Sequence, residues 1–314
     1  MNQKSFFSFF AIVLLICSCS RDKYVTFSGY AQGGTYQVKA NLKGVTVSKK
    51  SIAADIDSLL NEIDFSISGY NKNSLLSKRN AGEEIIPDRH FEALCTLSEK
   101  YRQLSNGAFD VNAGPLFDIW GFGFKNDSLP SPERIAAAMK DTQEKKVLNF
   151  NAIAQGYSCD VIASYLKKLG VEDMLVDIGE IYCSGVNAEG KGWSIGIDTP
   201  TDGNNTPGES LSGIWQSEGQ ACGVVTSGNY RKFYIKDGKK YAHTIDPRSG
   251  YPVNHSLLSA TVIAPSAAEA DALATICMVL GPEEAKELIE SLENVEAYFI
   301  MSEGSWRSSA FKLK

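Results

Sequence analysis

Residues 156–186 read GYSCDVIASYLKKLGVEDMLVDIGEIYCSGV, and this stretch decides the fold because one helix pattern is followed at once by two strand patterns. The apolar positions of residues 156–169 recur at helical spacing, namely Val161, Ile162, Tyr165 and Leu166. Gly170 is a typical helix terminator. Residues 174–177 and 181–186 are short apolar strand candidates. This order is typical of an α+β chain rather than of a doubly wound parallel sheet.

The rest of the chain continues the same pattern in both directions. Apolar spacing, capping residues or a helix-starting proline predict helices over residues 51–63 and 88–104, from 132, over 266–280, and from 282. Strands are predicted over residues 24–30, 35–42, 193–198, within 211–236, and within 295–314. We therefore expect an α+β fold with mixed or antiparallel sheets and flanking helices. The sequence contains no internal repeat, no GxGxxG fingerprint and no P-loop.

The composition is that of a globular protein with an acidic balance. The chain has 314 residues, of which 43% are hydrophobic and 22% charged, with a formal net charge of −6. A nucleic-acid partner would call for a concentrated basic surface, whereas the basic residues here are scattered. The one short cluster, residues 231–240, alternates with aromatics as in a solvated hairpin. We therefore expect no nucleic-acid partner.

The first residues have the features of an export signal rather than of the fold. Lys4 gives a positive start, and residues 6–16 form an apolar stretch too short to span a bilayer. The sequence Ile16-Cys17-Ser18-Cys19 resembles a bacterial lipobox, and Cys19 fits best because a small residue precedes it. We expect a leader over residues 1–18 and a single domain over 19–314, anchored to the membrane on its periplasmic side through lipidated Cys19. A plain secretory signal is the alternative.

The cysteines give no sign of a disulfide framework or a zinc site. Beyond the leader and Cys19 there are five, at Cys95, Cys159, Cys183, Cys222 and Cys277, and no CxxC pair occurs. An odd, widely spaced set is not typical of a disulfide-stabilised exported domain. We expect most of them to be buried as small hydrophobic residues.

Two glycine-containing segments are candidates for ligand contact. The first, which we expect to be irregular, combines glycines and aromatics in Gly107-Ala108-Phe109-Asp110 and in residues 112–115 and 120–123. Glycine lets the backbone approach a ligand and an aromatic ring can stack on a flat group, although a turn with core aromatics explains the segment equally well. The second, residues 149–156, precedes a helix and could bind an anion at the helix N-terminus.

Two further clusters carry chemically useful side chains. His243, Asp246 and Arg248 lie within one octet, where a structural turn at Pro247 is the alternative. Asp271 and Thr275 are four residues apart near the start of a helix, so both project from the same face. A carboxylate, a hydroxyl and nearby backbone carbonyls are the hard oxygens that suit Mg²⁺, although such a carboxylate also serves the helix dipole alone.

Taken in order, these segments resemble the ApbE family of FAD:protein FMN transferases. The resemblance covers nearly the whole mature chain. It rests on Gly33-Gly34-Thr35, Tyr70, the segments at 107–110 and 120–123, and residues 153–160, 176–180, 226–231, 243–252 and 270–275. It implies a two-lobed flavin-transferase fold related to the T-fold. It also implies an enzyme that binds FAD with Mg²⁺ and transfers the FMN half to a threonine hydroxyl, releasing AMP. The implied acceptors are exported, membrane-associated electron-transfer subunits, such as those of sodium-pumping NADH:quinone reductases and Rnf-type complexes.

The same resemblance implies the residues of the site. The implied FAD contacts are Gly33, Tyr70, Ala108, Phe109, Asp110, Asn149, Gln155 and Ile245. The implied metal ligands are the Ala152 carbonyl, Asp271 and Thr275. Members of the family commonly have Asp at the position of Asn149, Lys at that of Gln155, and Asp-Gly-Gly where this chain has Asp177-Ile178-Gly179. The loss of the lysine removes a cation that could offset phosphate charge.

The chemistry predicts roles for the metal and for a base. Negative charge grows on the departing AMP, and Mg²⁺ held by Asp271 and Thr275 would neutralise it. The acceptor threonine needs a proton acceptor, for which Asp246 and His243 are the candidates. Two other functions stay open at this point. One is a periplasmic FAD pyrophosphatase, in which water attacks instead of threonine, and the other is a non-catalytic flavin-binding lipoprotein.

Overall fold

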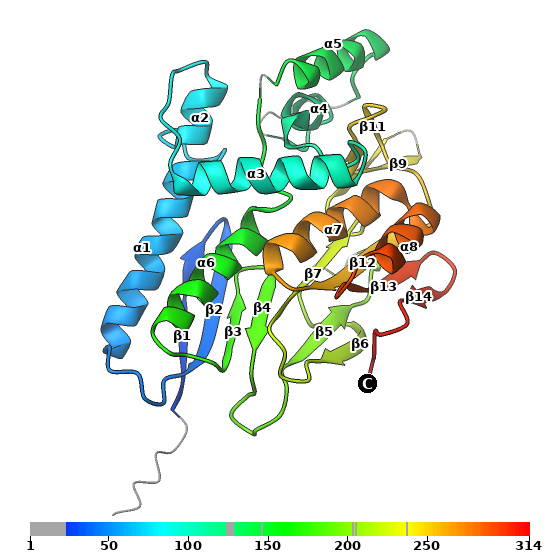
Figure 1. Cartoon of the computed structure of the whole chain (residues 1–314). Coiled ribbons are helices and arrows are strands. Elements are labelled where there is room, and N and C mark those ends of the chain that lie inside the picture. The colour runs from blue at the N-terminus through cyan, green and yellow to red at the C-terminus, as the bar shows by residue number, and fades with distance from the viewer. Residues whose placement is uncertain (1–22, 124–128, 146, 203, 205, 237) are drawn as a thin grey trace, which may run out of the picture.

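A computed structural model of the chain describes residues 23–123, 129–145, 147–202, 204, 206–236 and 238–314 (Figure 1). The expected leader and Cys19 lie outside these residues. The strands are β1 (Tyr24–Ala31), β2 (Gly34–Asn41), β3 (Met174–Asp177), β4 (Ile181–Ser184), β5 (Ser194–Asp198), β6 (Leu211–Gln216), β7 (Cys222–Gly228), β8 (Phe233–Lys236), β9 (Lys239–Ala242), β10 (Ile245–Asp246), β11 (Tyr251–Pro252), β12 (Leu257–Ala264), β13 (Glu296–Met301) and β14 (Ser305–Arg307). The helices are α1 (Lys49–Ile67), α2 (Leu75–Asn80), α3 (Arg89–Leu104), the 3₁₀ turn η1 (Val111–Ala113), α4 (Gly114–Ile119), α5 (Pro132–Gln143), α6 (Ala154–Lys168), α7 (Ala267–Leu280) and α8 (Pro282–Ser291).

One large antiparallel sheet organises the described residues. Its eight strands run in the order β1-β2-β3-β4-β7-β12-β13-β14, and each neighbouring pair is antiparallel. Between the adjacent strands β2 and β3 the chain leaves the sheet and returns. The two ends of this excursion meet where Asn41 N–H donates to the Asp173 carbonyl at 2.9 Å and Asn41 Nδ2 donates to the Asp173 carboxylate at 3.0 Å.

Helices cover one face of this sheet and a small hairpin covers the other (Figure 1). On the helical face, α1 and α6 pack on β1 to β3 around Val38, Ile56 and Ile162, and α3, α7 and α8 pack on β7, β12 and β13. On the opposite face, Trp215 and Ile195 of the β5–β6 hairpin pack against Val224 and its neighbours. The α+β prediction, with an antiparallel sheet and flanking helices, is confirmed.

A second group of elements gathers at one end of the sheet. Figure 1 shows α3 crossing this end, with α2, α4, α5 and the strands β9 and β11 beyond it. Here α4 and α5 share a small apolar core with Ile245 and Trp120, whose indole Nε1 donates to the Gly250 carbonyl at 2.9 Å. Four rings, those of Trp120, Tyr241, Tyr234 and Phe122, stack in series with centroids 5.3–5.8 Å apart. The predicted hairpin at residues 231–240 is present as β8 and β9.

Local sequence signals explain where several helices begin. Asp88 caps α3 by accepting hydrogen bonds from His90 N–H and Phe91 N–H. Ser266 caps α7 through Glu269 N–H, and Pro132 is the first residue of α5. The segment that we expected to be irregular, residues 107–123, instead contains η1 and α4. Its aromatics Phe109 and Trp120 are buried, as the alternative of a turn with core aromatics predicts.

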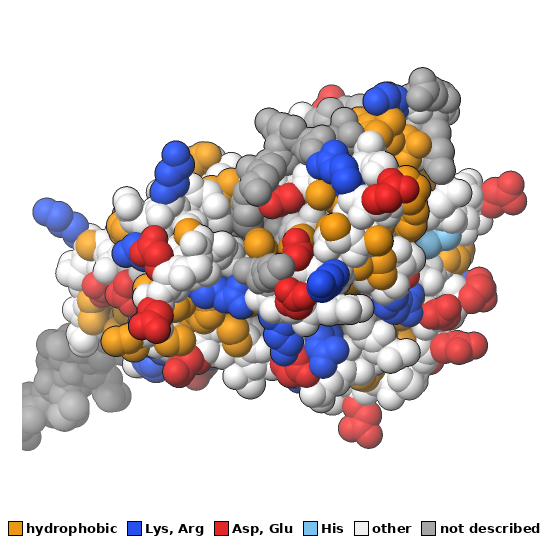
Figure 2. Space-filling model, turned by 90° about the horizontal axis from the view of Figure 1, so that it is seen from above, with side chains coloured by type: hydrophobic (Ala, Val, Ile, Leu, Met, Phe, Trp, Pro, Cys, Tyr) orange, Lys and Arg blue, Asp and Glu red, His pale blue; other side chains and the backbone are white. Residues whose placement is uncertain are grey.

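The cysteines lie mostly in the interior, and charges of both signs lie on the surface. Cys159, Cys183, Cys222 and Cys277 are buried free thiols, and Cys95 is half-buried. On the face seen in Figure 2, acidic and basic side chains of the described residues are interspersed. In the described part of the chain, no helix combines the length and the apolar character needed to span a bilayer.

Candidate functional site

The N-termini of α6 and α7 cross in close contact. A Cβ atom at Gly156 would lie 2.3 Å from the Ala267 carbonyl oxygen, so only glycine permits this crossing. The Gly156 N–H donates to Asp271 Oδ2 at 3.0 Å. In return, the Asp160 carboxylate of α6 accepts hydrogen bonds from Ala267 N–H and Ala268 N–H at 2.8 and 2.9 Å. Each helix therefore supplies a carboxylate to the N-terminus of the other, where the helix dipole favours it.

Asp271 is the most informative side chain at this junction. It is 5% exposed, and burial raises its pKa to about 7; the Gly156 hydrogen bond lowers the pKa and the charge of Asp160 raises it further. Burial likewise raises the pKa of Asp160 to about 6. The pKa of Glu180 is also raised by burial and by the charges of Asp271 and Asp177. The fold thus concentrates carboxylates where a bound cation would relieve their repulsion.

The residues implied as metal ligands lie in the two chain segments that meet at this junction. Ala152 lies four residues before Gly156, whose N–H is bonded to Asp271, and Thr275 follows Asp271 by one turn of α7. Their carbonyl, carboxylate and hydroxyl oxygens are donors that fit Mg²⁺. Among the described residues, no group of three or more His, Cys, Asp or Glu side chains is arranged to hold a metal. Any metal here would therefore depend on neutral oxygens beside Asp271.

The anion site expected at residues 149–156 is partly filled by the protein itself, because one N–H of the first turn of α6 is bonded to Asp271. Gln155 Nε2 donates to the Ile178 carbonyl at 3.0 Å and lies against Gly179. Gln155 therefore joins α6 to the loop between β3 and β4. At the position where the family resemblance implies lysine, this chain therefore has a neutral amide bonded to the backbone.

Tyr70 and Asn149 are linked through one intermediate residue. Asn149 is buried, and its Oδ1 accepts from Asn151 N–H at 2.9 Å. The Asn151 amide in turn donates to the Tyr70 hydroxyl at 3.2 Å. Tyr70 is 70% exposed, so its side chain lies at the surface of the molecule.

Gly33 lies in the exposed turn between β1 and β2, with a positive φ of 82° that favours glycine. The preceding Gln32 hydrogen bonds to Ser158 of α6. The turn is thereby held against the same helix that carries Gln155, so residues far apart in the sequence meet around the start of α6.

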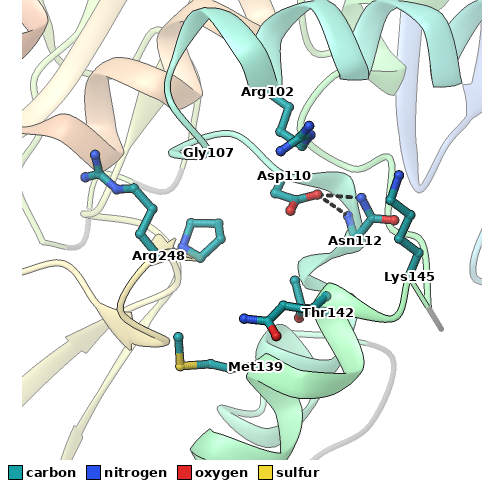
Figure 3. A pocket seen from close by; sticks show the side chains of 10 residues that line it. Arg102, Gly107, Asp110, Asn112, Met139, Thr142, Lys145 and Arg248 are labelled. Atoms are coloured by element: carbon teal, nitrogen blue, oxygen red, sulfur yellow. Dashed lines mark hydrogen bonds between the residues drawn. The ribbon is translucent and has the colours of Figure 1, made fainter.

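A cavity of about 380 Å³ lies between the C-terminal ends of α3 and α5 and the loop at Pro247 (Figure 3). Arg102, Lys145 and Arg248 are among its lining residues, and the guanidinium groups of Arg102 and Arg248 are paired with Glu99 and Asp246. Asp110 Oδ1 faces Asn112 and accepts from its N–H and Nδ2 at 2.9 and 2.6 Å. This cavity joins an implied FAD contact, Asp110, to the octet that contains Arg248.

The other implied contacts in these segments are buried. Ala108 and Phe109 are 1% and 2% exposed, and the Phe109 ring packs edge-to-face on Tyr101. Ile245 is 1% exposed within the core beside α4 and α5. These three residues therefore expose almost no surface to a ligand in this structure.

The octet contains the predicted structural turn together with its chemically useful groups. Asp246 accepts from Arg248 N–H at 2.9 Å and holds the guanidinium through both carboxylate oxygens. His243 packs against the Phe122 ring, and its Nδ1 lies 3.1 Å from the Lys232 carbonyl. Burial and the charge of Lys232 lower the pKa of His243 to about 4, so the imidazole is neutral at neutral pH. His243 and Asp246 thus have separate partners.

A second hollow, of about 660 Å³, lies on the face of the sheet opposite to α6 and α7. Its lining includes Glu180, Thr226 and Arg231, and Arg231 pairs with Asp198 at its edge. Sequence reasoning missed the roles of Asp160 and Glu180. Both stand inside segments that carry the family resemblance, residues 153–160 and 176–180, but no local pattern showed that their charges would meet Asp271.

Comparison with known proteins agrees with this geometry. The sequence profile of the ApbE family matches residues 32–299. The chain belongs to the ApbE family. It is 32% identical over 334 residues to the FAD:protein FMN transferase of Haemophilus influenzae, covering 96% of this chain and 95% of that protein. It is 34% identical over 304 residues to the FAD:protein FMN transferase of Escherichia coli, covering 87% and 85%.

Solved structures of family members share the fold. The flavin transferase ApbE from Vibrio cholerae superposes with a TM-score of 0.80 at 29% identity, covering 92% of this chain and 98% of that one. The flavinyl transferase ApbE from Pseudomonas stutzeri, in its apo form, gives a TM-score of 0.80 at 33% identity, covering 92% and 96%. The antiparallel sheet with flanking helices described above is therefore the fold of the family.

Proposed function

We propose that this chain is an FAD:protein FMN transferase, which uses Mg²⁺ to transfer the FMN half of FAD to a threonine hydroxyl of an exported electron-transfer protein and releases AMP. The relatives named above carry the transferase name. The observation that supports the proposal most directly is the Gly156–Asp271 hydrogen bond. It joins two segments 115 residues apart, which carry the implied metal ligands, at a buried and acidic junction.

Bound Mg²⁺ would supply charge neutralisation on the pyrophosphate, and Ala152, Asp271 and Thr275 are the residues that would hold it. The protein itself positions the dinucleotide. Tyr70 lies exposed at the surface, and Asp110 lines a cavity together with Arg102 and Lys145. Ionised Asp271 is costly in its buried setting, so the metal-free site is poised to gain from a cation.

The acceptor hydroxyl must lose a proton as it attacks, and two observations support His243 over Asp246 as the base. Both oxygens of Asp246 are held by Arg248, which suits a residue that orders the loop. His243 stays neutral at neutral pH, and a proton on Nδ1 toward the Lys232 carbonyl would leave Nε2 able to accept one. In our proposal His243 accepts the proton and Asp246 positions the octet.

One assay tests the transfer and separates it from the alternatives. Purified protein is incubated with FAD, Mg²⁺ and an acceptor domain bearing the threonine, and the acceptor is then weighed by mass spectrometry. Transfer gives an acceptor that carries FMN, together with free AMP. Free FMN and AMP with an unmodified acceptor would instead show a pyrophosphatase. Intact FAD in every sample would show a non-catalytic binder.

The controls follow from the site. An acceptor with valine in place of its threonine should receive no FMN. His243→Gln should abolish most transfer while leaving FAD affinity unchanged, whereas Asp246→Asn should weaken both through the Arg248 loop. Equal transfer by wild type and His243→Gln would remove His243 from the mechanism.

We also propose that the mature protein is exported and anchored through lipidated Cys19 on the periplasmic side of the membrane. The lipobox-like sequence at Cys19 supports this proposal, as does the kind of acceptor that the family resemblance implies.

A further inference from the structure

Two of the five cysteines lie side by side on neighbouring strands of the central sheet. Cys183 on β4 and Cys222 on β7 are direct partners in the antiparallel register. Their sulfur atoms lie 3.7 Å apart, and the side chains are 0% and 3% exposed. They belong to the apolar core beneath the β5–β6 hairpin. The sequence alone does not predict this contact, because the two cysteines are 39 positions apart.

We propose that Cys183 and Cys222 form an interstrand disulfide once the chain has been exported. Each thiol loses its proton and together the two sulfurs give up two electrons to form the S–S bond. The oxidant is the reactive disulfide of a thiol-oxidising protein in the exported compartment, which takes up the two electrons and two protons and becomes a dithiol. The proposal rests on the proposed export and is independent of flavin transfer.

The backbone already meets the requirements of such a bond. Directly opposed residues of antiparallel strands have Cα atoms about 4.5–5.5 Å apart, within the range that disulfides span. A disulfide has a sulfur separation of about 2.0 Å, so the side chains must close about 1.7 Å, which rotation about the Cα–Cβ bonds supplies. The sheet does not have to move.

The other three cysteines have different surroundings. The Cys159 thiol donates to the Glu180 carbonyl at 3.0 Å from α6, on the opposite face of the sheet. Cys277 lies in α7, and Cys95 is half-buried in α3. Oxidation should therefore select one pair from an odd set and leave three thiols free.

The bond would fasten the loop that carries β5, β6 and the polar segment between them. It would close a ring from Cys183 to Cys222, and the second hollow, lined by Ile195, Asp198 and Glu180, lies beside it. Its expected role is to hold β4 against β7, next to the acidic loop at Glu180, in a compartment without a reducing thiol pool.

Thiol labelling of the full chain tests the proposal. The protein is produced with its own leader, recovered from membranes, and unfolded without reductant in excess iodoacetamide before digestion and peptide mass mapping. Cys95, Cys159 and Cys277 should be alkylated, whereas Cys183 and Cys222 should be found in one cross-linked pair of peptides. Treatment with a phosphine reductant before alkylation should release both. Alkylation of Cys183 and Cys222 without reduction in the exported protein would overturn the proposal.

Single substitutions provide the matched controls. Cys183→Ser should make Cys222 newly reactive, and Cys222→Ser should do the same for Cys183. Cys159→Ser should leave the cross-linked peptides unchanged. If Cys222 stays protected in Cys183→Ser, it pairs elsewhere and the assignment is wrong. Because the readout is the peptide mass, its failure is separate from any failure of FMN transfer.

Discussion

Replacing Asp271 by asparagine should stabilise the metal-free protein at alkaline pH, contrary to the usual effect of a substitution in a core. The folded-state pKa of Asp271 is raised from 3.8 to about 7 because the carboxyl group is buried. The metal-free fold therefore retains a proton that the unfolded chain releases, and its stability falls as the pH rises from about 4 to 7. Asparagine cannot ionise, and its carbonyl oxygen can still accept the Gly156 N–H.

The structure sets the magnitude of this effect. One pKa unit corresponds to about 1.4 kcal/mol, so ionised Asp271 costs the metal-free fold on the order of 4 kcal/mol at pH 8, as an upper bound. In EDTA at pH 8 the variant should melt roughly 5–10 °C above wild type. Near pH 4 that advantage should disappear, because wild-type Asp271 is protonated there.

Thermal melts from pH 4 to 8, with EDTA or with Mg²⁺, measure the pH dependence of stability and the stabilisation by the metal. Mg²⁺ should raise the melting temperature of wild type at pH 8 and leave Asp271→Asn unchanged. Thr275→Val should keep the wild-type pH dependence in EDTA but gain less from Mg²⁺, since it loses an oxygen and no charge. A variant less stable than wild type at pH 8 in EDTA, or equal Mg²⁺ responses in all three proteins, would refute the reasoning.

Three other substitutions give sharp outcomes. Gly156→Ala should cost about 2–3 kcal/mol in urea unfolding because its Cβ meets backbone at 2.3 Å, whereas Gly34→Ala, with nothing within 4 Å, should leave stability unchanged. Tyr70→Ala should weaken FAD binding by roughly 1–3 kcal/mol in calorimetry with almost no change in melting temperature; a stability loss at unchanged affinity would contradict stacking. Cys19→Ser should move the protein from the membrane to the soluble fraction, and release by Cys17→Ser instead would show that the anchor is misassigned.

Local patterns in the sequence predicted the elements well because their causes are local. Residues 88–104 were predicted as a helix, and α3 spans Arg89–Leu104 with Asp88 as its cap. The prediction was wrong over residues 114–119, where Gly114 and the glycines nearby suggested irregular chain. The structure shows α4 there, because Pro115 starts a helix whose apolar residues are buried among α5 and Ile245.

The site was less predictable because its causes are long-range. Hydrogen bonds that join residues about 110 positions apart set the surroundings of Asp271 and of Asp160. Residue spacing along the sequence does not predict contacts over such a separation. The resemblance named the implied ligand residues. The burial of Asp160 and the two hydrogen bonds from the Arg248 guanidinium to Asp246 became visible only in the three-dimensional structure.

The two hydrogen bonds between Asn41 and Asp173 have a consequence for how the molecule responds to ligands. The described residues between them form one excursion, which includes α1 to α6, Tyr70, Asp110 and Ala152, and which leaves and rejoins the sheet at neighbouring strands. A ligand that contacts both Asp271 and this excursion would tie the excursion to the rest of the protein at a second point. Because two ties on one loop share the entropy of closing it, a bound ligand should slow hydrogen exchange at the Asn41 and Asp173 end of the β2–β3 ladder.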